Sequence, residues 1–481
     1  MTSDLVGGSW QACATETGIH LENPATGEVI GPALGSSPER VEAALAAADA
    51  LGAWDSADRA AVLDAVAAEV AGAAPEIVAL ESRATGVPIR QTTPLGMILA
   101  GAFALAAGQL RTGLLTSVTT REDGREVLVE RLPWGPAACL VPWNAPAPMA
   151  AHKVANALAA GCPVILKPSE YAPSGTERLA VAIHEALREA GAPPALFQLL
   201  HGGADVGARI VGDPRIRAVS FTGGLGGGRA VAAACAYDIK PVQLELGGNN
   251  ALIVMPDADE DAAARAAADL LTTLNGQWCR ALGRLIVPAG REQALVDAIL
   301  RRVETLVTGD PADEATDYGP LIHSGHRATV IKARDGLGGT VHEAALDGPG
   351  NTLAPALVTG ADPADTVDEI FGPVAAVHGY RDLDEAVRLA NGTRYGLEGY
   401  VIGADEEQAL ATARRVRAGE VKVNGSSIMS LHLFTPRPAW GISGYSEEGT
   451  AETLLFFTNP RVVGVEGGFA LHSREEPHSR E

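Results

Sequence analysis

The amino-acid sequence predicts an α/β protein with two doubly wound parallel-sheet domains and a small additional β element. Strand-like apolar runs alternate with helix-like segments over residues 133–246, and the alternation starts again over residues 247–440. Strands that alternate with helices form parallel sheets with right-handed crossovers. Two β-prone pieces flank Asp123-Gly124 and predict a hairpin, because Asp-Gly is a favoured turn between antiparallel strands.

The N-terminal region precedes the first alternation. Residues 1–35 combine short apolar pieces with turn signals such as Asn23-Pro24 and predict small edge strands. Ser37-Pro38-Glu39 is typical of a helix start, because serine caps the N-terminus and proline suits the first turn. Ala-rich helical segments are expected from there to about Leu110.

The core strands are predicted from apolar runs. Those of the first alternation are Ala137–Val141, Pro163–Leu166, Leu196–Leu200, Ala218–Phe221 and Val242–Leu246. Those of the second include Leu252–Val254, Leu285–Val287 and Gly399–Ile402. A late run, Arg461–Val465, predicts one more strand, and the polar tail after it is expected to be poorly ordered.

Composition limits the possible partners and the compartment. A net charge of −22 argues against binding to nucleic acid or to an anionic membrane. The longest uncharged apolar run, Leu95–Gly108, is too short to span a bilayer and predicts a buried helix. The start of the chain lacks a secretory pattern, so we expect a cytoplasmic protein. The five cysteines show no metal-ligand spacing, which predicts no metal site.

Three stretches carry residues suited to thioester chemistry. Cys279 lies in Asn275-Gly276-Gln277-Trp278-Cys279-Arg280, shortly before an apolar run, where its thiol could attack a carbonyl carbon. Glu245 lies in a strand-like run that ends in a double glycine, and Asn144 lies between prolines that fix its backbone. A thiol, a carboxylate and an amide donor can together form a thioester, stabilise its oxyanions and hydrolyse it.

These stretches resemble the G-Q-x-C, E-L-G-G and P-W-N segments of the aldehyde dehydrogenase superfamily. Further matches follow the family's order over roughly residues 20 to 460, at Asn23–Gly27, Lys167–Glu170, Phe221–Gly223 and Glu369–Val374.

The resemblance implies NAD-dependent oxidation of an aldehyde to a carboxylic acid. Cys279 would form a thiohemiacetal and, after hydride transfer, a thioester. The Asn144 side chain and the Cys279 backbone N–H would hold the oxyanion, and Glu245 would assist hydrolysis.

The resemblance also assigns roles to the parts of the chain. The hairpin and the late strand would join subunits, giving a homodimer or homotetramer. The expected parts are a Rossmann-like NAD-binding domain (1–115 and 134–246), a catalytic domain (247–457), an oligomerisation element (116–133 and 458–466) and a polar tail (467–481).

The glycine-rich run at residues 223–228 follows a predicted strand and opens a helix, where backbone N–H groups can approach a pyrophosphate. The run matches neither G-x-G-x-x-G nor a Walker A loop, and by itself it is equally consistent with a flexible turn. The family has G-S-x-x-x-G at this point. Gly223 and Gly228 match that pattern, whereas Gly224 replaces a serine that contacts phosphate.

Other cofactor contacts are implied by the same resemblance. Lys167 and Glu170 would bind the hydroxyls of the adenosine ribose, and Glu369 those of the nicotinamide-side ribose. Phe371 would pack near the nicotinamide ring and Trp143 near its phosphate. A carboxylate at Glu170 would repel a 2′-phosphate, which favours NAD over NADP.

The C-terminal part departs from the family, and two other functions stay open. Gly441 stands where the family often has lysine. Trp440, Phe434 and Leu433 could line an apolar substrate entrance, or Trp440 could pack between domains. An acylating enzyme would pass the thioester to coenzyme A, but Glu245 favours hydrolysis. A non-catalytic member would be expected to lose Cys279 or Asn144, and this chain keeps both.

Overall fold

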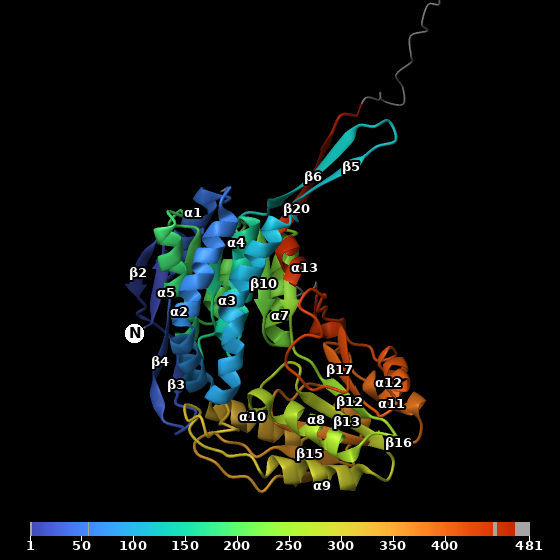
Figure 1. Ribbon diagram of the computed structural model, residues 1–481. Coiled ribbons are helices and arrows are strands. Elements are labelled where there is room, and N and C mark those ends of the chain that lie inside the picture. The colour runs from blue at the N-terminus through green and yellow to red at the C-terminus, as the bar shows by residue number, and fades with distance from the viewer. Residues whose placement is uncertain (1, 56, 446–449, 467–481) are drawn as a thin grey trace, which may run out of the picture.

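A computed structural model describes residues 2–55, 57–445 and 450–466. Two sheets, each with helices packed against it, form the body, and a narrow β arm projects from it (Figure 1). The predicted fold class, two doubly wound parallel sheets with a small β element, is therefore confirmed. The predicted tail at 467–481 lies outside the described residues.

The first sheet has the strand order β19-β11-β10-β7-β8-β9-β1-β2. Its five central strands are parallel, and each coincides with a predicted run to within two residues at either end. The central strands are β7 (Ala137–Leu140), β8 (Val164–Lys167), β9 (Phe197–Leu199), β10 (Ala218–Thr222) and β11 (Val242–Glu245). The remaining strands are antiparallel to their neighbours and are β1 (Ser3–Val6), β2 (Ser9–Ala12) and β19 (Gly444–Tyr445). The central strands are predominantly apolar because helices cover both faces of the sheet.

Alternate residues of the central strands supply two separate cores. In β7, Ala137 and Cys139 face one core, whereas Ala138 and Leu140 face the other. The helices of the first core are α2 (Arg59–Thr85), α3 (Ile89–Arg111), α4 (Pro146–Ala160) and α5 (Ser174–Glu189), and those of the second are α1 (Pro38–Leu51), α6 (Ala204–Gly212) and α7 (Leu225–Tyr237). This alternation follows from the two-residue period of a strand.

One helix in the described part of the chain, α3, is long and apolar enough by length and composition to cross a membrane. In the structure it packs against α2 and α4, and its Leu99, Phe103 and Ala106 are buried in the first core. The apolar run Leu95–Gly108 therefore belongs to a core helix, as the sequence predicts.

The second sheet has the order β14-β15-β16-β13-β12-β17-β18 and is parallel except for β14. The chain passes from β12 to β13 and β16 on one side and then returns to β17 and β18 on the other, which makes the sheet doubly wound. Its strands are β12 (Asn250–Val254), β13 (Leu282–Pro288), β14 (Thr340–Glu343), β15 (Ala356–Thr359), β16 (Val374–Tyr380), β17 (Glu398–Ile402) and β18 (Glu420–Val423), and its helices are α8 (Glu260–Thr272), α9 (Glu292–Val303), α10 (Ser324–Asp335), α11 (Leu383–Ala390) and α12 (Glu406–Ala413).

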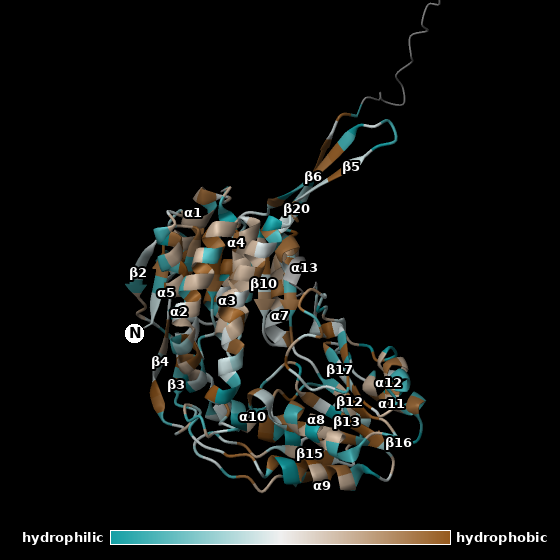
Figure 2. Cartoon of the chain, in the orientation of Figure 1, coloured by the Kyte–Doolittle hydropathy of each residue, from teal (hydrophilic) through white to brown (hydrophobic). Residues whose placement is uncertain are grey.

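The arm consists of three antiparallel strands, β5 (Thr116–Thr120), β6 (Glu126–Pro133) and β20 (Thr458–Gly464), in the order β20-β6-β5. This arrangement confirms the predicted hairpin, and the late strand pairs with it. Figure 2 shows hydrophobic residues on the arm away from the body, and Val118, Val462 and Val463 are largely exposed there. A second small sheet pairs β3 (Thr15–Glu22) with β4 (Val29–Gly35).

The predicted end of the second domain, at residue 457, differs from the observed packing. β19 pairs with β11 of the first sheet, with Gly444 opposite Glu245. Helix α13 (Thr450–Phe456) packs against α3 and α4. Leu454 and Phe457 are fully buried in the first core, so burial of apolar side chains draws this segment back to the first sheet.

Candidate active site

The site lies where the first sheet meets the loop that leads into β13. Lys167 and Glu245 end the parallel strands β8 and β11, and both side chains are buried. Ligands of open α/β sheets bind at this carboxyl edge of the strands. The loop that carries Cys279 reaches the same place from the second sheet, so the two halves of the chain each contribute residues.

The Cys279 loop is held in an unusual backbone conformation. Leu274 and Asn275 have positive φ angles of 50° and 57°. The buried Asn275 amide donates to the carbonyls of Gly86 (2.9 Å) and Pro320 (3.0 Å) and fixes this turn. A Cβ atom on Gly276 would lie 2.4 Å from the Pro373 nitrogen, so this position accepts only glycine. The 3-10 helix η1 (Thr273–Gly276) therefore delivers Cys279 to a fixed position.

Asn144 is joined directly to this loop. Its Nδ2 donates a hydrogen bond of 3.0 Å to the carbonyl oxygen of Gln277, two residues before Cys279. The Gln277 side chain accepts from the Ile322 N–H at 3.0 Å, and Asn250 donates to the Cys279 carbonyl at 2.9 Å. The structure thus brings together two of the sequence-predicted site residues, Asn144 and Cys279.

Glu245 completes the group. It is buried, and its Oε2 lies 3.8 Å from Nη2 of Arg280, the residue that follows Cys279. The pKa of the Cys279 thiol is raised to about 12, mainly by burial. Arg280 and Arg437 act to lower it, and Glu245 and Glu369 act to raise it. A resting thiol with this pKa is protonated at neutral pH, so it needs a base or a positive charge to react as a thiolate.

The other four cysteines differ from Cys279 in exposure. Cys13, Cys139, Cys162 and Cys235 are buried, whereas Cys279 is partly exposed. Cys139 and Cys162 belong to the first core, as expected for small buried hydrophobes. No group of three or more potential metal ligands occurs in the described parts of the chain.

The predicted adenosine side of the cofactor site lies at the end of β8. Lys167 is buried, and its Nζ donates to the Pro168 carbonyl at 3.0 Å and lies 3.8 Å from Glu170 Oε2. Burial lowers the pKa of the Lys167 ammonium, and the nearby Glu170 and Asp205 raise it. Glu170 is less buried than Lys167, so its carboxylate is reachable for a ligand.

The start of α7 fits a phosphate group. Gly224 caps this helix in an extended conformation (φ −71°, ψ 155°) and provides no side-chain hydrogen bond to its first N–H groups. A Cβ atom at Gly224 would have nothing within 4 Å, whereas one at Gly228 would lie 2.4 Å from Leu246. Gly228 therefore permits close packing of helix on strand, and the free helix N-terminus faces open space that an anion can enter.

The predicted nicotinamide side contains Trp143, Glu369 and Phe371. The rings of Trp143 and Phe371 meet edge to face with centroids 5.4 Å apart. Glu369 accepts a hydrogen bond of 2.9 Å from the Gly248 N–H, and burial raises the pKa of its carboxyl to about 7. These three residues come from distant parts of the chain and gather beside the Glu245 segment.

Sequence reasoning missed a histidine on this side. His326 packs against Trp143 with ring centroids 5.1 Å apart, and its Nε2 lies 2.8 Å from the Phe371 carbonyl. Burial lowers the pKa of His326 to about 4, so the ring is neutral at physiological pH. His326 lies at the start of α10, and only the fold brings it to Trp143.

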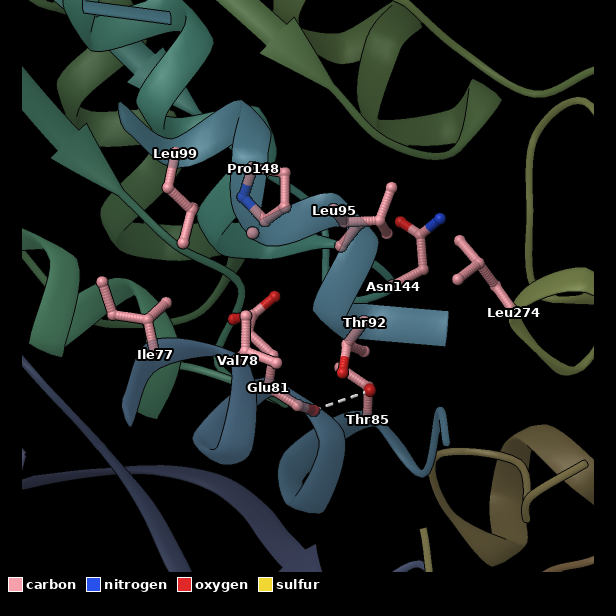
Figure 3. A pocket seen from close by; sticks show the side chains of 12 residues that line it. Ile77, Val78, Glu81, Thr85, Thr92, Leu95, Leu99, Asn144, Pro148 and Leu274 are labelled. Atoms are coloured by element: carbon pink, nitrogen blue, oxygen red, sulfur yellow. Dashed lines mark hydrogen bonds between the residues drawn. The ribbon is translucent and has the colours of Figure 1, made fainter. Parts of the chain in front are cut away.

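A small cavity lies behind Asn144, between α2, α3 and α4 (Figure 3). Its volume of about 10 Å³ is close to the space needed for one water molecule. Glu81 lines it, accepts from the Ala147 N–H at 3.3 Å, and has its pKa raised to about 8 by burial. Glu81 thus braces the start of α4 next to Asn144, a contact that no sequence motif indicates.

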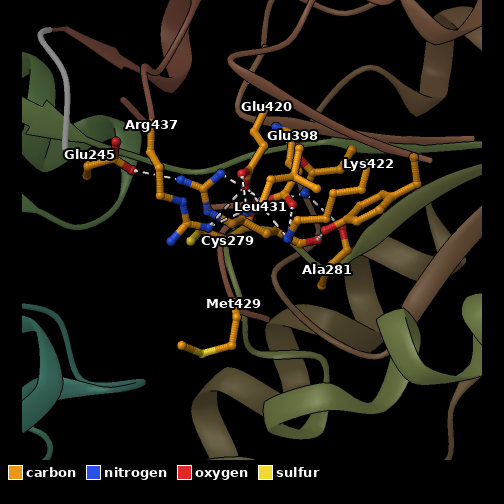
Figure 4. Close-up of polar contacts among 12 residues, drawn as sticks. Glu245, Cys279, Ala281, Glu398, Glu420, Lys422, Met429, Leu431 and Arg437 are labelled. Carbon is orange, nitrogen blue, oxygen red and sulfur yellow. Dashed lines mark hydrogen bonds and ion pairs between the residues drawn. The ribbon is translucent and has the colours of Figure 1, made fainter. Parts of the chain in front are cut away.

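A second missed group is a set of buried charges beside Cys279 (Figure 4). Glu398 accepts from Arg280 at 2.8 Å and lies 2.5 Å from Lys422 Nζ. Glu420 and Arg437 complete the set. Two residues in the sequence could have indicated this set: Arg280, directly after Cys279, and Glu398, directly before the predicted strand Gly399–Ile402.

The backbone at Gly441, the first residue of η3 (Gly441–Ser443), explains one departure from the family pattern. Gly441 has φ +63°, and a Cβ atom there would lie 2.2 Å from the Arg394 carbonyl, so a lysine does not fit. Trp440 is 45% exposed, and Leu433 and Phe434 are also largely exposed. These side chains present an apolar surface and are not packed into an interior.

Fold and site together define an α/β enzyme whose cysteine loop, carried by one doubly wound sheet, meets the strand ends of another. The aldehyde dehydrogenase family model matches residues 10–463. The chain belongs to this family. The predicted enzyme class, an oxidoreductase that acts on aldehydes, is therefore confirmed.

Curated relatives match nearly the whole chain. It is 34% identical over 441 residues to a geranial dehydrogenase from Castellaniella defragrans, covering 88% of this chain and 90% of the relative. It is 31% identical over 464 residues to a putative aldehyde dehydrogenase from Staphylococcus saprophyticus, with coverage of 93% and 94%.

Solved structures agree. A betaine aldehyde dehydrogenase variant from Staphylococcus aureus, in complex with NAD+, has a TM-score of 0.90, 26% identity and coverage of 98% and 99%. An aldehyde dehydrogenase variant from Pseudomonas syringae, with NAD+ and octanal, has a TM-score of 0.87, 30% identity and coverage of 96% of both chains. The predicted cofactor, NAD, is the one bound in both neighbours.

Proposed function

We propose that this enzyme oxidises an aldehyde to a carboxylic acid with NAD, through a thiohemiacetal and a thioester on Cys279. The observation that carries this proposal is the hydrogen bond from Asn144 to the Gln277 carbonyl, which holds an amide donor against the cysteine loop. A donor at that place can reach the oxygen of an aldehyde attacked by the thiol. NAD, when bound, accepts the hydride from the aldehyde carbon.

Three residues of the chain carry out the remaining steps of the reaction. Cys279 forms the bond to carbon, and the Asn144 amide with the Cys279 N–H binds the oxyanion. Each such donor contributes about 3 kcal/mol to transition-state stabilisation. Glu245 takes a proton from the water that hydrolyses the thioester. Glu245 lies close to Arg280, the residue that follows Cys279. A carboxylate at this place can activate water, which supports hydrolysis of the thioester over its transfer to coenzyme A.

NAD is proposed over NADP. Lys167 and Glu170 bind the adenosine ribose, Gly223 and Gly228 shape the phosphate turn, and Glu369 binds the nicotinamide-side ribose beside Phe371 and Trp143. The partly exposed Glu170 carboxylate would face a 2′-phosphate and repel it. A comparison of kcat/KM for the two cofactors tests this, and equal values would show that Glu170 does not reach the ribose.

The proposed substrate is an apolar aldehyde. Met429, Leu431, Leu433, Phe434 and Trp440 are exposed hydrophobic side chains in the segment that precedes η3. The names of two relatives, geranial dehydrogenase and the octanal complex, fit this surface. A panel of short, long, aromatic and charged aldehydes assayed by NADH formation tests the proposal, which equal kcat/KM for acetaldehyde and octanal would contradict.

The parts of the chain are proposed to act as the sequence indicates. The first sheet binds NAD, the second carries the nucleophile, and the arm joins subunits into a homodimer or homotetramer through its exposed valines. The acidic chain is proposed to work in the cytoplasm without nucleic acid or membrane partners.

The experiment that tests the nucleophile is Cys279→Ala. We expect dehydrogenase activity to fall by about 10³-fold or more, because the covalent intermediates cannot form. NAD binding, followed by quenching of protein fluorescence, should stay within about twofold, since the dinucleotide contacts lie mainly on the first sheet. Activity above a few per cent of the unmodified enzyme would refute the assignment.

A further inference from the structure

The buried charges beside Cys279 come from four separate segments. Arg280 follows the cysteine, Glu398 begins β17, Glu420 and Lys422 lie on β18, and Arg437 precedes η3. We call these five residues the ion cluster. The side chains of four of them are at most 7% exposed, and Arg437, at the rim, is 24% exposed.

Two neighbouring strands place carboxylates side by side in the interior, where cations must balance their charge. Glu398 and Glu420 are register partners in the parallel pair of β17 and β18, so two carboxylates lie close together in the interior. Arg280 donates to Glu398 at 2.8 Å, and Lys422 Nζ lies 2.5 Å from the other oxygen of Glu398. Arg437 Nη2 lies 3.5 Å from Glu420 and 3.8 Å from Glu398.

The ion cluster contains three cations and two carboxylates, which leaves one net positive charge. An unbalanced charge in a protein interior is costly and favours a negative charge nearby. Arg280 turns its second amino group toward Glu245, at 3.8 Å from Oε2. Figure 4 shows Glu245, Cys279 and Arg437 in the same group of side chains.

Two groups can supply the balancing negative charge, the Glu245 carboxylate and the Cys279 thiolate. A third carboxylate that faces the thiol, Glu369, is hydrogen-bonded to the Gly248 N–H. The arrangement therefore accommodates one anion, on either the oxygen of Glu245 or the sulfur of Cys279.

We propose that the ion cluster supplies the single positive charge that lets Cys279 and Glu245 share one proton. When the S–H bond of Cys279 breaks, an O–H bond forms on Glu245, and the negative charge moves from carboxylate to thiolate. The total charge of the site does not change in this step, so the cluster stabilises both forms relative to the fully protonated pair. Loss of one cation from the cluster therefore favours the fully protonated pair and lowers the amount of thiolate. Arg280 and Arg437 are thus electrostatic positioning residues for the nucleophile. This proposal rests on the proposed roles of Cys279 and Glu245.

The test measures alkylation of Cys279 by iodoacetamide in the full-length enzyme at pH 8, followed by intact mass, with Cys279→Ala as the background. Because the thiolate is the reactive form, a pKa shift of one unit changes its concentration tenfold at a pH well below the pKa, and a shift of two units changes the rate by about tenfold after allowing for the change in nucleophilicity. A unit charge several ångströms away at an effective dielectric of about 20 shifts a pKa by about one to two units.

The sign of each change distinguishes electrostatics from packing. Arg280→Met removes a positive charge and should slow alkylation by about tenfold or more. Glu398→Gln removes a negative charge and should accelerate it by about tenfold or more. The double variant restores the net charge and should return to within about threefold of the unmodified enzyme. Steady-state turnover with aldehyde and NAD should fall with Arg280→Met.

Two further variants keep the test decisive. Arg437→Met removes the same charge at the partly exposed rim, so it should slow alkylation even if the buried Arg280→Met fails to fold. Arg381→Met removes a charge from a surface arginine that is 78% exposed and paired with Glu385, and it should leave the rate unchanged.

Equal rates in all cluster variants, or a change of the same sign for Arg280→Met and Glu398→Gln, would overturn the proposal. That failure is distinguishable from failure of the proposed function, in which Cys279→Ala would keep its dehydrogenase activity.

Discussion

Single residues determine how this site differs from the family pattern. Gly441 cannot be a lysine, because its positive φ and the nearby Arg394 carbonyl leave no room for a side chain. Gly228 is similarly constrained by Leu246, whereas Gly224 has open space in front of it. The backbone at position 224 therefore has room for the serine that the family usually has there.

Restoring that serine should strengthen cofactor binding. In Gly224→Ser the new hydroxyl would stand at the helix N-cap, in an extended conformation that serine adopts readily, and could donate to a phosphate. A hydrogen bond to a charged group contributes about 1.5 kcal/mol, so we expect the KM for NAD to fall by about tenfold. The matched control is Gly226→Ser, two residues further along the chain, where an added Cβ atom also has nothing within 4 Å. An unchanged KM in Gly224→Ser would show that the phosphate does not approach this cap.

Local patterns were enough to predict most individual elements. The predicted apolar runs Pro163–Leu166 and Val242–Leu246 supply strands β8 and β11, because helices bury both faces of the sheet. The Asp123-Gly124 turn gives the hairpin because that dipeptide suits a tight antiparallel connection. Asn144 contacts the loop that carries Cys279, through the Gln277 carbonyl.

Contacts between distant elements could not be read from the sequence. Strand β19 has two residues and no pattern of its own, and it joins β11 because the flanking apolar side chains are buried in the first core. Arg280 and Glu398 are separated by 118 positions, and only the order of strands in the second sheet brings them together. The brace from Glu81 to Ala147 is equally a product of helix packing.

The arm has an exposed apolar surface and a predicted role in assembly. Val462→Glu places a charge on β20, where the side chain is 67% exposed, so it should leave the subunit folded. If the arm joins subunits, light scattering after gel filtration should show a smaller particle, because a buried unpaired charge is costly at an interface. Ile30→Glu on β4, with a similarly exposed apolar side chain outside the arm, is the control. An unchanged mass for Val462→Glu would contradict a role of this face in assembly.

For the molecule as a whole, the active site exists only where two halves of the chain meet. Glu245 ends a strand of the first sheet, and Cys279 lies on a loop of the second. Asn144 and Arg280 link them through the Gln277 carbonyl and the Glu245 carboxylate. We therefore propose that Cys279, on the second half, carries the thioester and that Glu245, on the first half, activates the water that hydrolyses it.

The most direct test of that division is pre-steady-state kinetics of Glu245→Gln. The glutamine keeps the size of the side chain but cannot take a proton from water. Mixed with aldehyde and NAD, the variant should release a burst of about one NADH per active site and then turn over slowly, as an acyl-enzyme accumulates. The burst should be slower than in the unmodified enzyme, because Glu245 is also proposed to accept the thiol proton, and it should speed up at higher pH, where the thiolate forms unaided. Mass spectrometry should find the acyl group on Cys279. Steady-state turnover equal to that of the unmodified enzyme at neutral pH, with no trapped adduct, would contradict the account.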